Sequence, residues 1–503
     1  MATRHIVAML LPAWGHTIGY LNAAIQMLSK DSGLVITIVQ HNLVAPKTTA
    51  ELAGRSHDKT RLRVLGVGDT RLDLGPATLK VATEQLVSGW MENIARMAQG
   101  SEGWPKPRSI HFDFACGGLV VEATKKIVGP ACKTLLWWSS LVVSMPANLS
   151  NYDFVAIAHE IYADESRRSG RSLDDVLQQV AEAGNGTDEL SGLTLKYPGG
   201  PDMYDHEAHA YASGRPLSAA MLTQAQTLAR AVDGYIVPSS TVLEPVGVPF
   251  CRELYVKRGQ EVFTIGTQVD EECWNGGGAV EPSNETVKAF LDSAVREYGP
   301  KSVLYISFGS VFFPVKTPRL VEALIDVLLN LELPFPFIFA LGAQMASLPA
   351  PLIQRVHESE KGLICDFWVE QAALLQHGAV GWFLTHGGFN SVSESLTQGI
   401  PLIIWPVAAE QPVNAGFLSA EPNAVAIELF QVRTGPQLGP SLRSDAKIAG
   451  TVLAASEEFK AVFTAARGSR GALLQANAGR MARALRESHT TEGAEELVRL
   501  TEF

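Results

Sequence analysis

One segment of the sequence, residues 368–411, gathers side chains whose chemistry suits a charged ligand that carries a sugar. It reads WVEQAALLQHGAVGWFLTHGGFNSVSESLTQGIPLIIWPVAAEQ, with a Trp at one end, a His before two glycines in the middle, and an acid and an amide at the other end. An aromatic ring can stack on a base, a His can donate to phosphate, and acid and amide groups can bind hydroxyls. The segment therefore has the parts needed to bind a whole nucleotide sugar.

The middle of this segment predicts a strand, a turn and a helix in succession. Residues 381–385 are a short apolar run typical of a buried strand, and residues 386–388 form a glycine turn that lets the backbone approach a ligand closely. A helix is expected from Phe389 to about Gly399. Its first N–H groups and its positive dipole end could bind phosphate, with His386 beside them. Because glycine turns are common, the turn alone does not identify the ligand.

The whole segment closely resembles the donor-binding signature of plant-type family 1 UDP-glycosyltransferases. That signature opens with Trp, carries His-x-Gly-aromatic-Asn-Ser and a Glu in its middle, and closes with an acid followed by Gln, and these landmarks fall in register here without a gap. Two positions depart from the pattern, since Glu370 stands where Pro is usual and Phe389 where Trp is usual. Neither departure removes a group that the chemistry requires.

The resemblance implies a role for each landmark. Trp368 stacks on uracil, Gln371 and Glu394 face the nucleoside, and Glu394 accepts hydrogen bonds from the ribose hydroxyls. The diphosphate lies against the helix start, and the final acid and amide bind the sugar hydroxyls. The expected donor-binding residues are Ser310, Trp368, Val369, Gln371, His386, Gly388, Asn390, Ser391, Glu394, Glu410 and Gln411, and Ser139 resembles a position that touches the donor sugar.

The chain alternates strand-like and helix-like patterns, which predicts an α/β protein with parallel sheets. Its 503 residues are more than one hydrophobic core usually serves, since single cores stop growing at about 250–300 residues. Together with the resemblance, this predicts a GT-B fold of two Rossmann-like, doubly wound domains facing a cleft. The expected parts are an N-terminal acceptor-binding domain (1–266), a linker (267–300), a C-terminal UDP-sugar-binding domain (301–480) and a C-terminal helix that braces the first domain (481–503).

Two residues of the N-terminal half are candidates for catalysis. His16 lies in the loop after the first strand-like run, and Asp113 ends the later run Ile110-His-Phe-Asp. An isolated His or Asp is more often structural than catalytic, and the sequence gives no distance between them. The same family, however, has a catalytic His in a Pro-x-x-Gly-His loop and an Asp after a later strand, and both patterns occur here.

These residues imply an inverting reaction. His16 takes the proton of an acceptor hydroxyl, Asp113 orients the imidazole, and the oxygen attacks the anomeric carbon in line with departing UDP. The sequence contains no Asp-x-Asp pair of the kind that holds a metal in many transferases. Charge on the leaving group would instead meet the helix start after Gly388 and the loop of Ser310. We therefore expect metal-independent transfer without a cofactor, with a UDP-sugar as co-substrate.

Composition narrows the class of protein further. The net charge of −11 argues against a general electrostatic grip on nucleic acid. Five widely spaced cysteines without CxxC pairs suggest neither a disulfide framework nor a zinc site. No stretch reaches the about 18 apolar residues of a membrane span, and the apolar start is too short for a signal peptide. The expected protein is cytoplasmic, monomeric and without an integral membrane association.

The sugar and the acceptor are less well defined by the sequence. Glu410-Gln411 matches the ending usual in glucosyltransferases, so UDP-glucose is expected, with UDP-xylose or another UDP-sugar as the alternative. The acceptor is expected to be a small apolar alcohol or phenol, such as a phenolic or terpenoid metabolite, bound by loops within 70–103 and 152–211. Candidate pocket walls are Trp14, Trp90, Trp138 and Tyr204.

Three other functions are weighed against this one. A binder of nucleotide sugars without transfer would not need the pair His16 and Asp113. A serine hydrolase would need Gly-x-Ser-x-Gly, and the sequence around Ser310 lacks the second glycine. A sterol or lipid glycosyltransferase would favour a basic amphipathic segment, which the sequence does not show clearly.

Overall fold

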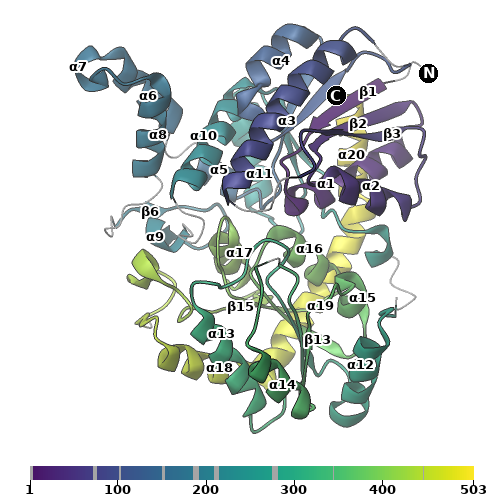
Figure 1. The fold of residues 1–503 in the computed structure, drawn as a ribbon, viewed down its shortest axis with the longest axis vertical. Helices are drawn as coiled ribbons and strands as arrows, with labels where there is room; N and C mark the ends of the chain where they lie inside the picture. The colour runs from purple at the N-terminus through teal and green to yellow at the C-terminus, as the bar shows by residue number, and fades with distance from the viewer. Residues whose placement is uncertain are drawn as a thin grey trace. The chain divides into compact units, whose positions relative to one another are not determined.

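The computed structural model of the chain describes residues 4–71, 76–100, 103–149, 153–184, 192–208, 215–274, 281–343, 345–445 and 447–503. The chain divides into two compact units, whose elements are labelled in Figure 1. The first unit comprises residues 1–185, 215–268 and 488–503, and the second comprises residues 186–214 and 269–487. The sequence had assigned residues 192–208 to the N-terminal domain, whereas the structure groups them with the second unit.

The first unit is built on a seven-stranded sheet in the order β3-β2-β1-β4-β5-β8-β9, with all neighbours parallel. Its central strands are buried along their length, which explains why they read as unbroken apolar runs. The strands are β1 (Arg4–Met9), β2 (Leu34–His41), β3 (Leu62–Val67), β4 (Ser109–Asp113), β5 (Lys133–Trp137), β8 (Gly234–Val237) and β9 (Glu261–Thr264).

Helices follow the strands of the first sheet, as parallel connections require. They are α1 (Trp14–Lys30), α2 (Ala45–Ala53), α3 (Pro76–Met97), the 3-10 helix η1 (Gly117–Leu119), α4 (Val121–Val128), α5 (Ser144–Leu149), α6 (Phe154–Ala163), α7 (Glu165–Arg168), α8 (Leu173–Gly184), α10 (Arg215–Ala231), α11 (Gly247–Val256) and α20 (Glu492–Glu502).

The second unit has a six-stranded parallel sheet in the order β12-β11-β10-β13-β14-β15. Its strands are β10 (Val303–Ser307), β11 (Phe337–Ala340), β12 (Gly362–Cys365), β13 (Val380–Thr385), β14 (Leu402–Ile404) and β15 (Ala426–Glu428). Around them lie η3 (Glu271–Cys273), α12 (Glu285–Tyr298), α13 (Pro318–Leu329), α14 (Ala350–Glu358), α15 (Gln371–Gln376), α16 (Phe389–Thr397), α17 (Gln411–Leu418), η4 (Gly435–Leu438), α18 (Val452–Ala466) and most of α19 (Ser469–Thr490).

A small separate hairpin also belongs to the second unit. It consists of β6 (Thr194–Leu195) and β7 (Met203–Tyr204), which pair antiparallel, and it is followed by the single turn α9 (Asp205–Ala208). The sequence predicted none of these short elements.

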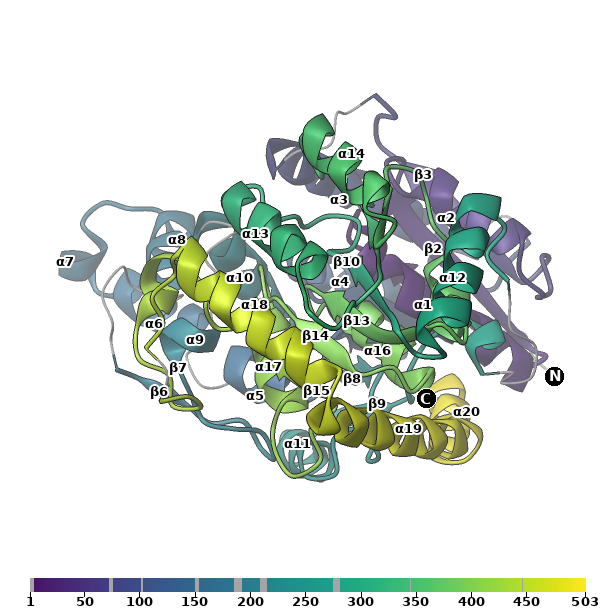
Figure 2. The same ribbon diagram turned by 90° about the horizontal axis from the view of Figure 1, so that it is seen from below.

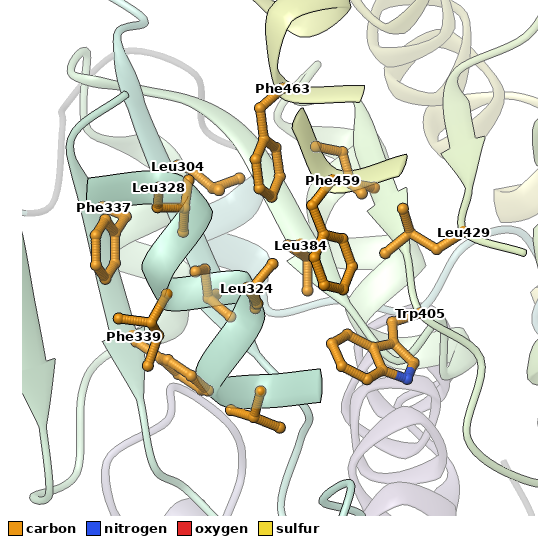
Figure 3. Close-up of a cluster of buried hydrophobic side chains, with 14 of the residues drawn as sticks. Leu304, Leu324, Leu328, Phe337, Phe339, Leu384, Trp405, Leu429, Phe459 and Phe463 are labelled. Carbon is orange, nitrogen blue, oxygen red and sulfur yellow. The ribbon is translucent and has the colours of Figure 1, made fainter. Parts of the chain in front are cut away.

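The core of the second unit lies where α13 and α18 pack side by side on one face of the sheet (Figure 2). Figure 3 shows the aromatic part of this core, with Phe459 and Phe463 of α18 beside Trp405 and the sheet residue Leu384. The rings of Trp405 and Phe459 have centroids 5.6 Å apart. This apolar layer holds β13 and β14, the strands that precede and follow α16.

The last helix, α20, packs on the first unit. Leu497 and Leu500 join the cluster formed by β1, α1 and the neighbouring strands. The Arg4 guanidinium donates to the Thr501 carbonyl at 3.3 Å, and Gly266 approaches Gly493 so closely that a Cβ on it would lie 3.4 Å from the Gly493 Cα. The chain end thus stabilises the sheet from which the chain begins.

This packing gives a test on α20. Leu497→Ala is expected to lower the free energy of unfolding of the first unit by about 2–5 kcal/mol, because it leaves a cavity under a fully buried side chain. Val498→Ala on the same helix removes a side chain that is 39% exposed and serves as the matched control. Urea unfolding followed by tryptophan fluorescence measures both. Equal stability of the two variants would mean that α20 is not part of this core.

Candidate functional site

In the first unit, the structure brings His16 and Asp113 together. His16 lies in the first turn of α1, just after β1, and Asp113 is the last residue of β4. Because β1 and β4 are neighbouring parallel strands, their carboxyl ends meet at one edge of the sheet. His16 Nδ1 lies 2.9 Å from Asp113 Oδ2. Both residues could be proposed from the sequence, but the distance between them could not.

The pair is asymmetric in its exposure and is held from several sides. The Asp113 side chain is fully buried, whereas 21% of the His16 side chain is exposed. Asp113 Oδ1 accepts from the backbone N–H of Ala115 at 2.9 Å, and Trp137 Nε1 donates to the His16 carbonyl at 3.2 Å. Phe114 stacks on the imidazole with ring centroids 5.2 Å apart. The carboxylate therefore orients an imidazole that solvent and ligands can reach.

A second hydrogen bond joins the same helix and strand one turn deeper. Tyr20, four residues after His16 on α1, is bonded through its hydroxyl to Nδ1 of His111, two residues before Asp113 on β4, at 2.7 Å. Both side chains are fully buried. Burial lowers the pKa of His111 to about 3. This neutral, buried bond fixes α1 against β4 and so supports the position of His16.

In the second unit, the strand–turn–helix predicted for residues 381–399 is present. β13 ends at Thr385, Gly387 has a φ of +85°, and α16 begins at Phe389 with Gly388 as its N-cap. No side chain caps the helix start. The first N–H groups of α16 can therefore serve an anionic ligand. Asn390 is half-buried and Ser391 is buried in this first turn.

His386 is buried in a cradle made by two glycines. A Cβ on Gly309 would lie 2.8 Å from His386 Cε1, and a Cβ on Gly388 would lie 2.4 Å from its Nε2. Gly309 also has a φ of +79°, which favours glycine. Thr385 Oγ1 lies 3.1 Å from His386 Nδ1. Burial lowers the pKa of His386 to about 4, so the ring is neutral at pH 7.

Gln371 and Glu394, which the sequence proposed as nucleoside contacts, lie together. Gln371 Nε2 donates to Glu394 Oε2 at 2.8 Å, and the Tyr305 hydroxyl donates to Gln371 Oε1 at 3.2 Å. Tyr305 comes from the neighbouring strand β10 and was missed by the sequence analysis, because an apolar strand run gives no sign of which hydroxyl it contributes. Trp368 is 68% exposed nearby in the sequence, and Val369 is half-buried.

The departure at Glu370 has a structural role. Its carboxylate accepts from the backbone N–H of Ser283 at 2.7 Å and from the Ser283 hydroxyl at 3.0 Å. Glu370 thereby fastens the start of the signature segment to the residues just before α12. The side chain that replaces the usual Pro provides hydrogen bonds in place of a rigid backbone.

The last two signature residues lie at the start of α17. Glu410 is its N-cap residue and is half-buried, while Gln411 is 1% exposed. Gln411 Oε1 accepts from the N–H groups of Val407 and Ala408, at 2.8 and 2.7 Å. The amide oxygen of Gln411 thus holds the loop that precedes α17. Ser310 is exposed in the loop after β10.

The aromatic residues proposed as walls of an acceptor pocket differ in how deeply they are buried. Trp90 is fully buried and donates to Thr124 Oγ1 at 2.9 Å, so it is a core residue of the first unit and not a wall. Trp138 is 3% exposed and packs on Phe114 with centroids 4.7 Å apart. Trp14 is half-buried beneath the Lys47 ammonium, 4.1 Å from its ring centroid. Ser139, after Trp138, is half-buried, as is Tyr204 in the second unit.

The described residues show no group of three or more His, Cys, Asp or Glu placed to hold a metal ion. The five cysteines are all buried and free. Among the helices that the structure describes, none combines the length and the apolar character that crossing a membrane requires.

Comparison with known proteins identifies this arrangement. Residues 275–436 match the family model described as UDP-glucoronosyl and UDP-glucosyl transferase. A solved structure of Medicago truncatula UGT71G1 complexed with UDP-glucose superposes on 99% of this chain and 98% of its own, with a TM-score of 0.72 at 18% identity. Phytolacca americana UGT2 superposes on 99% of both chains with a TM-score of 0.69 at 17% identity. The fold is therefore the GT-B fold that these enzymes share.

Sequence relatives agree with the fold. The chain is 32% identical to UDP-glycosyltransferase eriJ of Hericium erinaceus over 319 residues, which is 60% of each protein. It is 25% identical to UDP-glycosyltransferase 71C5 of Arabidopsis thaliana over 487 residues, 90% of each. The chain thus matches less than two thirds of the fungal relative's length. Over these stretches the chain is similar to UDP-glycosyltransferases, as the resemblance of residues 368–411 had indicated.

The buried histidines generate a prediction for pH dependence. His111 has a pKa near 3 in the folded protein and about 6.5 when unfolded, so below pH 6.5 the unfolded chain binds a proton that the folded chain does not. The free energy of unfolding is therefore expected to fall as the pH drops from 6.5 to 4, with His111 contributing up to about 1.4 kcal/mol per pH unit. His111→Asn should make this dependence shallower, whereas His159→Asn, at an exposed position, should not. Identical slopes for all three proteins would contradict the burial of a neutral His111.

Proposed function

We propose that this protein transfers a sugar from a UDP-sugar to a hydroxyl of a small apolar molecule, with inversion at the anomeric carbon. The observation that carries the proposal is the 2.9 Å contact between a fully buried Asp113 and a partly exposed His16. A buried carboxylate stabilises a neighbouring imidazolium, because in the low-dielectric interior its charge is weakly screened. The pair is thus suited to general base catalysis.

The contact between His16 Nδ1 and Asp113 indicates which ring nitrogen would take the proton. With Nδ1–H donating to Asp113, Nε2 is the nitrogen that takes the proton of the acceptor hydroxyl. The acceptor oxygen then forms the new bond to the anomeric carbon while the bond from that carbon to the UDP oxygen breaks. UDP leaves with the electron pair, and an α-linked donor yields a β-glycoside. The proton remains on His16 until it passes to solvent.

Features of the second unit support a site for the diphosphate leaving group. The start of α16 offers backbone N–H groups at the positive end of the helix dipole. His386 is neutral, so it can donate a hydrogen bond to UDP without repelling other donors or needing a counter-ion of its own. Fixed donors of this kind stabilise developing charge without reorganisation. We therefore propose that transfer needs no metal.

UDP-glucose is the proposed donor, with UDP-xylose or another UDP-sugar as the alternative. Support comes from Glu410 and Gln411 at the start of α17 and from the Medicago relative, whose structure is a complex with UDP-glucose. The proposed acceptor is a phenol or a terpenoid alcohol. The Phytolacca relative was solved with pterostilbene, and a Solanum relative is named a nuatigenin 3-beta-glucosyltransferase, so a sterol-like acceptor is the second candidate.

The first experiment combines UDP-glucose, EDTA and a panel of phenols and terpenoid alcohols, with product mass and UDP release as readouts. His16→Ala is expected to lower the rate by about 10²–10⁴-fold, because general base catalysis contributes on that order. UDP affinity is expected to stay within about twofold, since the proposed donor contacts lie in the second unit. His159→Ala, which removes an exposed His of the first unit, is the matched control.

Each outcome of this experiment is informative. A hexose mass gain that survives EDTA and is lost in His16→Ala supports metal-independent transfer. A rate that EDTA abolishes contradicts the metal-independent proposal, and a rate unchanged in His16→Ala contradicts the role of the pair. UDP binding without any product from any sugar donor would favour a binder of nucleotide sugars.

A further inference from the structure

Residues 192–208, the docked segment, are held on the second unit by a buried group of four charges. Glu207 of α9 is fully buried, and its carboxylate faces Arg433 and Arg443. Glu428 of β15 faces the same two guanidinium groups. Two acids and two arginines thus balance one another away from solvent.

Glu207 accepts hydrogen bonds both from the docked segment and from the loop that follows η4. Its Oε2 accepts from the N–H of Tyr204 within the docked segment at 3.0 Å and from the N–H of Leu442 at 3.0 Å. Its Oε1 accepts from the Ser441 hydroxyl and, at 3.4 Å, from Arg443 Nη2. Burial alone would raise the pKa of Glu207, but these donors and the Arg443 charge outweigh it and lower that pKa. Glu207 is therefore ionised and fully engaged.

A neighbouring side chain adds to the same attachment. His206 Nε2 lies 2.8 Å from the Pro440 carbonyl, and the His206 ring stacks on Tyr204 with centroids 5.3 Å apart. Met203, also in the docked segment, is fully buried. The segment thus combines an ionic anchor with apolar burial, although in sequence it lies far from the residues that it contacts.

The docked segment and Arg443 of the buried charged group both contact α17, the helix that begins with Gln411. A Cβ on Gly200 would lie 3.3 Å from the Phe417 ring, and a Cβ on Gly416 would lie 2.9 Å from Arg443 Nη1. Figures 1 and 2 show α9 beside α17, which contact each other. α17 is also hydrogen-bonded to the glycine turn before α16, because Asn414 Nδ2 donates to the Gly387 carbonyl at 2.9 Å. This turn is the proposed diphosphate site.

We propose that Glu207 is a positioning residue that locks the docked segment onto α17, so that an acceptor bound against this segment keeps a fixed place relative to the sugar-binding residues Glu410 and Gln411. The inference rests on the proposed function and deepens it. The docked segment lies within residues 152–211, which the sequence analysis associated with the acceptor. It moves as part of the donor-binding unit, and acceptor binding depends on its attachment.

Glu207→Gln tests this proposal, because it removes one charge and leaves the two arginines with only Glu428. Hydrogen exchange of backbone amides in residues 192–208 is expected to become at least about tenfold faster, since breaking a buried ion pair destabilises the segment that it holds. The KM for the best phenol of the panel is expected to rise about tenfold while UDP affinity changes less than about twofold. A purely structural defect would weaken both ligands together.

The matched control is Asp202→Asn, which removes a charge from the same segment. Asp202 pairs with Lys196 at the surface, and both side chains are exposed, so neither exchange nor KM should change. Should Glu207→Gln fail to fold, Ser441→Ala removes one hydrogen bond from Glu207 and is expected to shift exchange and KM in the same direction by a smaller factor.

The results separate the proposal from the proposed function. Unchanged exchange in folded Glu207→Gln protein would show that Glu207 does not lock the segment. Faster exchange with an unchanged acceptor KM would show that the segment does not position the acceptor. A wild-type protein that transfers no sugar would refute the proposed function, whereas the exchange measurement would still decide whether Glu207 is the lock.

Discussion

Parallel strand order is the constraint on which the candidate sites of both units depend. In the first sheet β1 neighbours β4, and in the second β10 neighbours β13, although other strands and helices separate each pair along the chain. Parallel neighbours end at the same edge, so whatever follows one strand meets whatever follows the other. That is why His16 meets Asp113 in the first unit and why Gly309 meets His386 in the second. The same strand geometry therefore brings together the candidate residues of each unit.

The two histidines at these edges show how burial sets function. His16 keeps part of its ring exposed beside a buried carboxylate, which suits a group that gains and loses a proton. His386 is enclosed by glycines and stays neutral, which suits a fixed donor. Two residues of the same type thereby suit different proposed roles, and the difference lies in the neighbours that the sheet order brings to each.

Much of this could be predicted from the sequence, and the limits have physical reasons. Long apolar runs such as 380–385 are legible because strands buried on both faces carry no polar positions. The signature residues are contiguous, so Gln371, His386 and Glu394 could be found by pattern. The order of strands in a sheet depends on contacts between distant segments, which no local pattern reveals. The contact of Tyr305 with Gln371 therefore could not be predicted. Trp90 was misjudged because a tryptophan looks the same in a sequence whether it lines a pocket or fills a core.

The buried cluster around Glu207 has a consequence for inheritance and engineering. A lone change at Glu207, Glu428, Arg433 or Arg443 leaves an unbalanced charge away from water, so single substitutions at these positions are disfavoured while joint ones are not. The four positions are therefore expected to covary, although they lie in two distant stretches of the chain. A chimera that imports a foreign stretch around residue 207 must import residues 428–443 from the same parent to remain electrically matched.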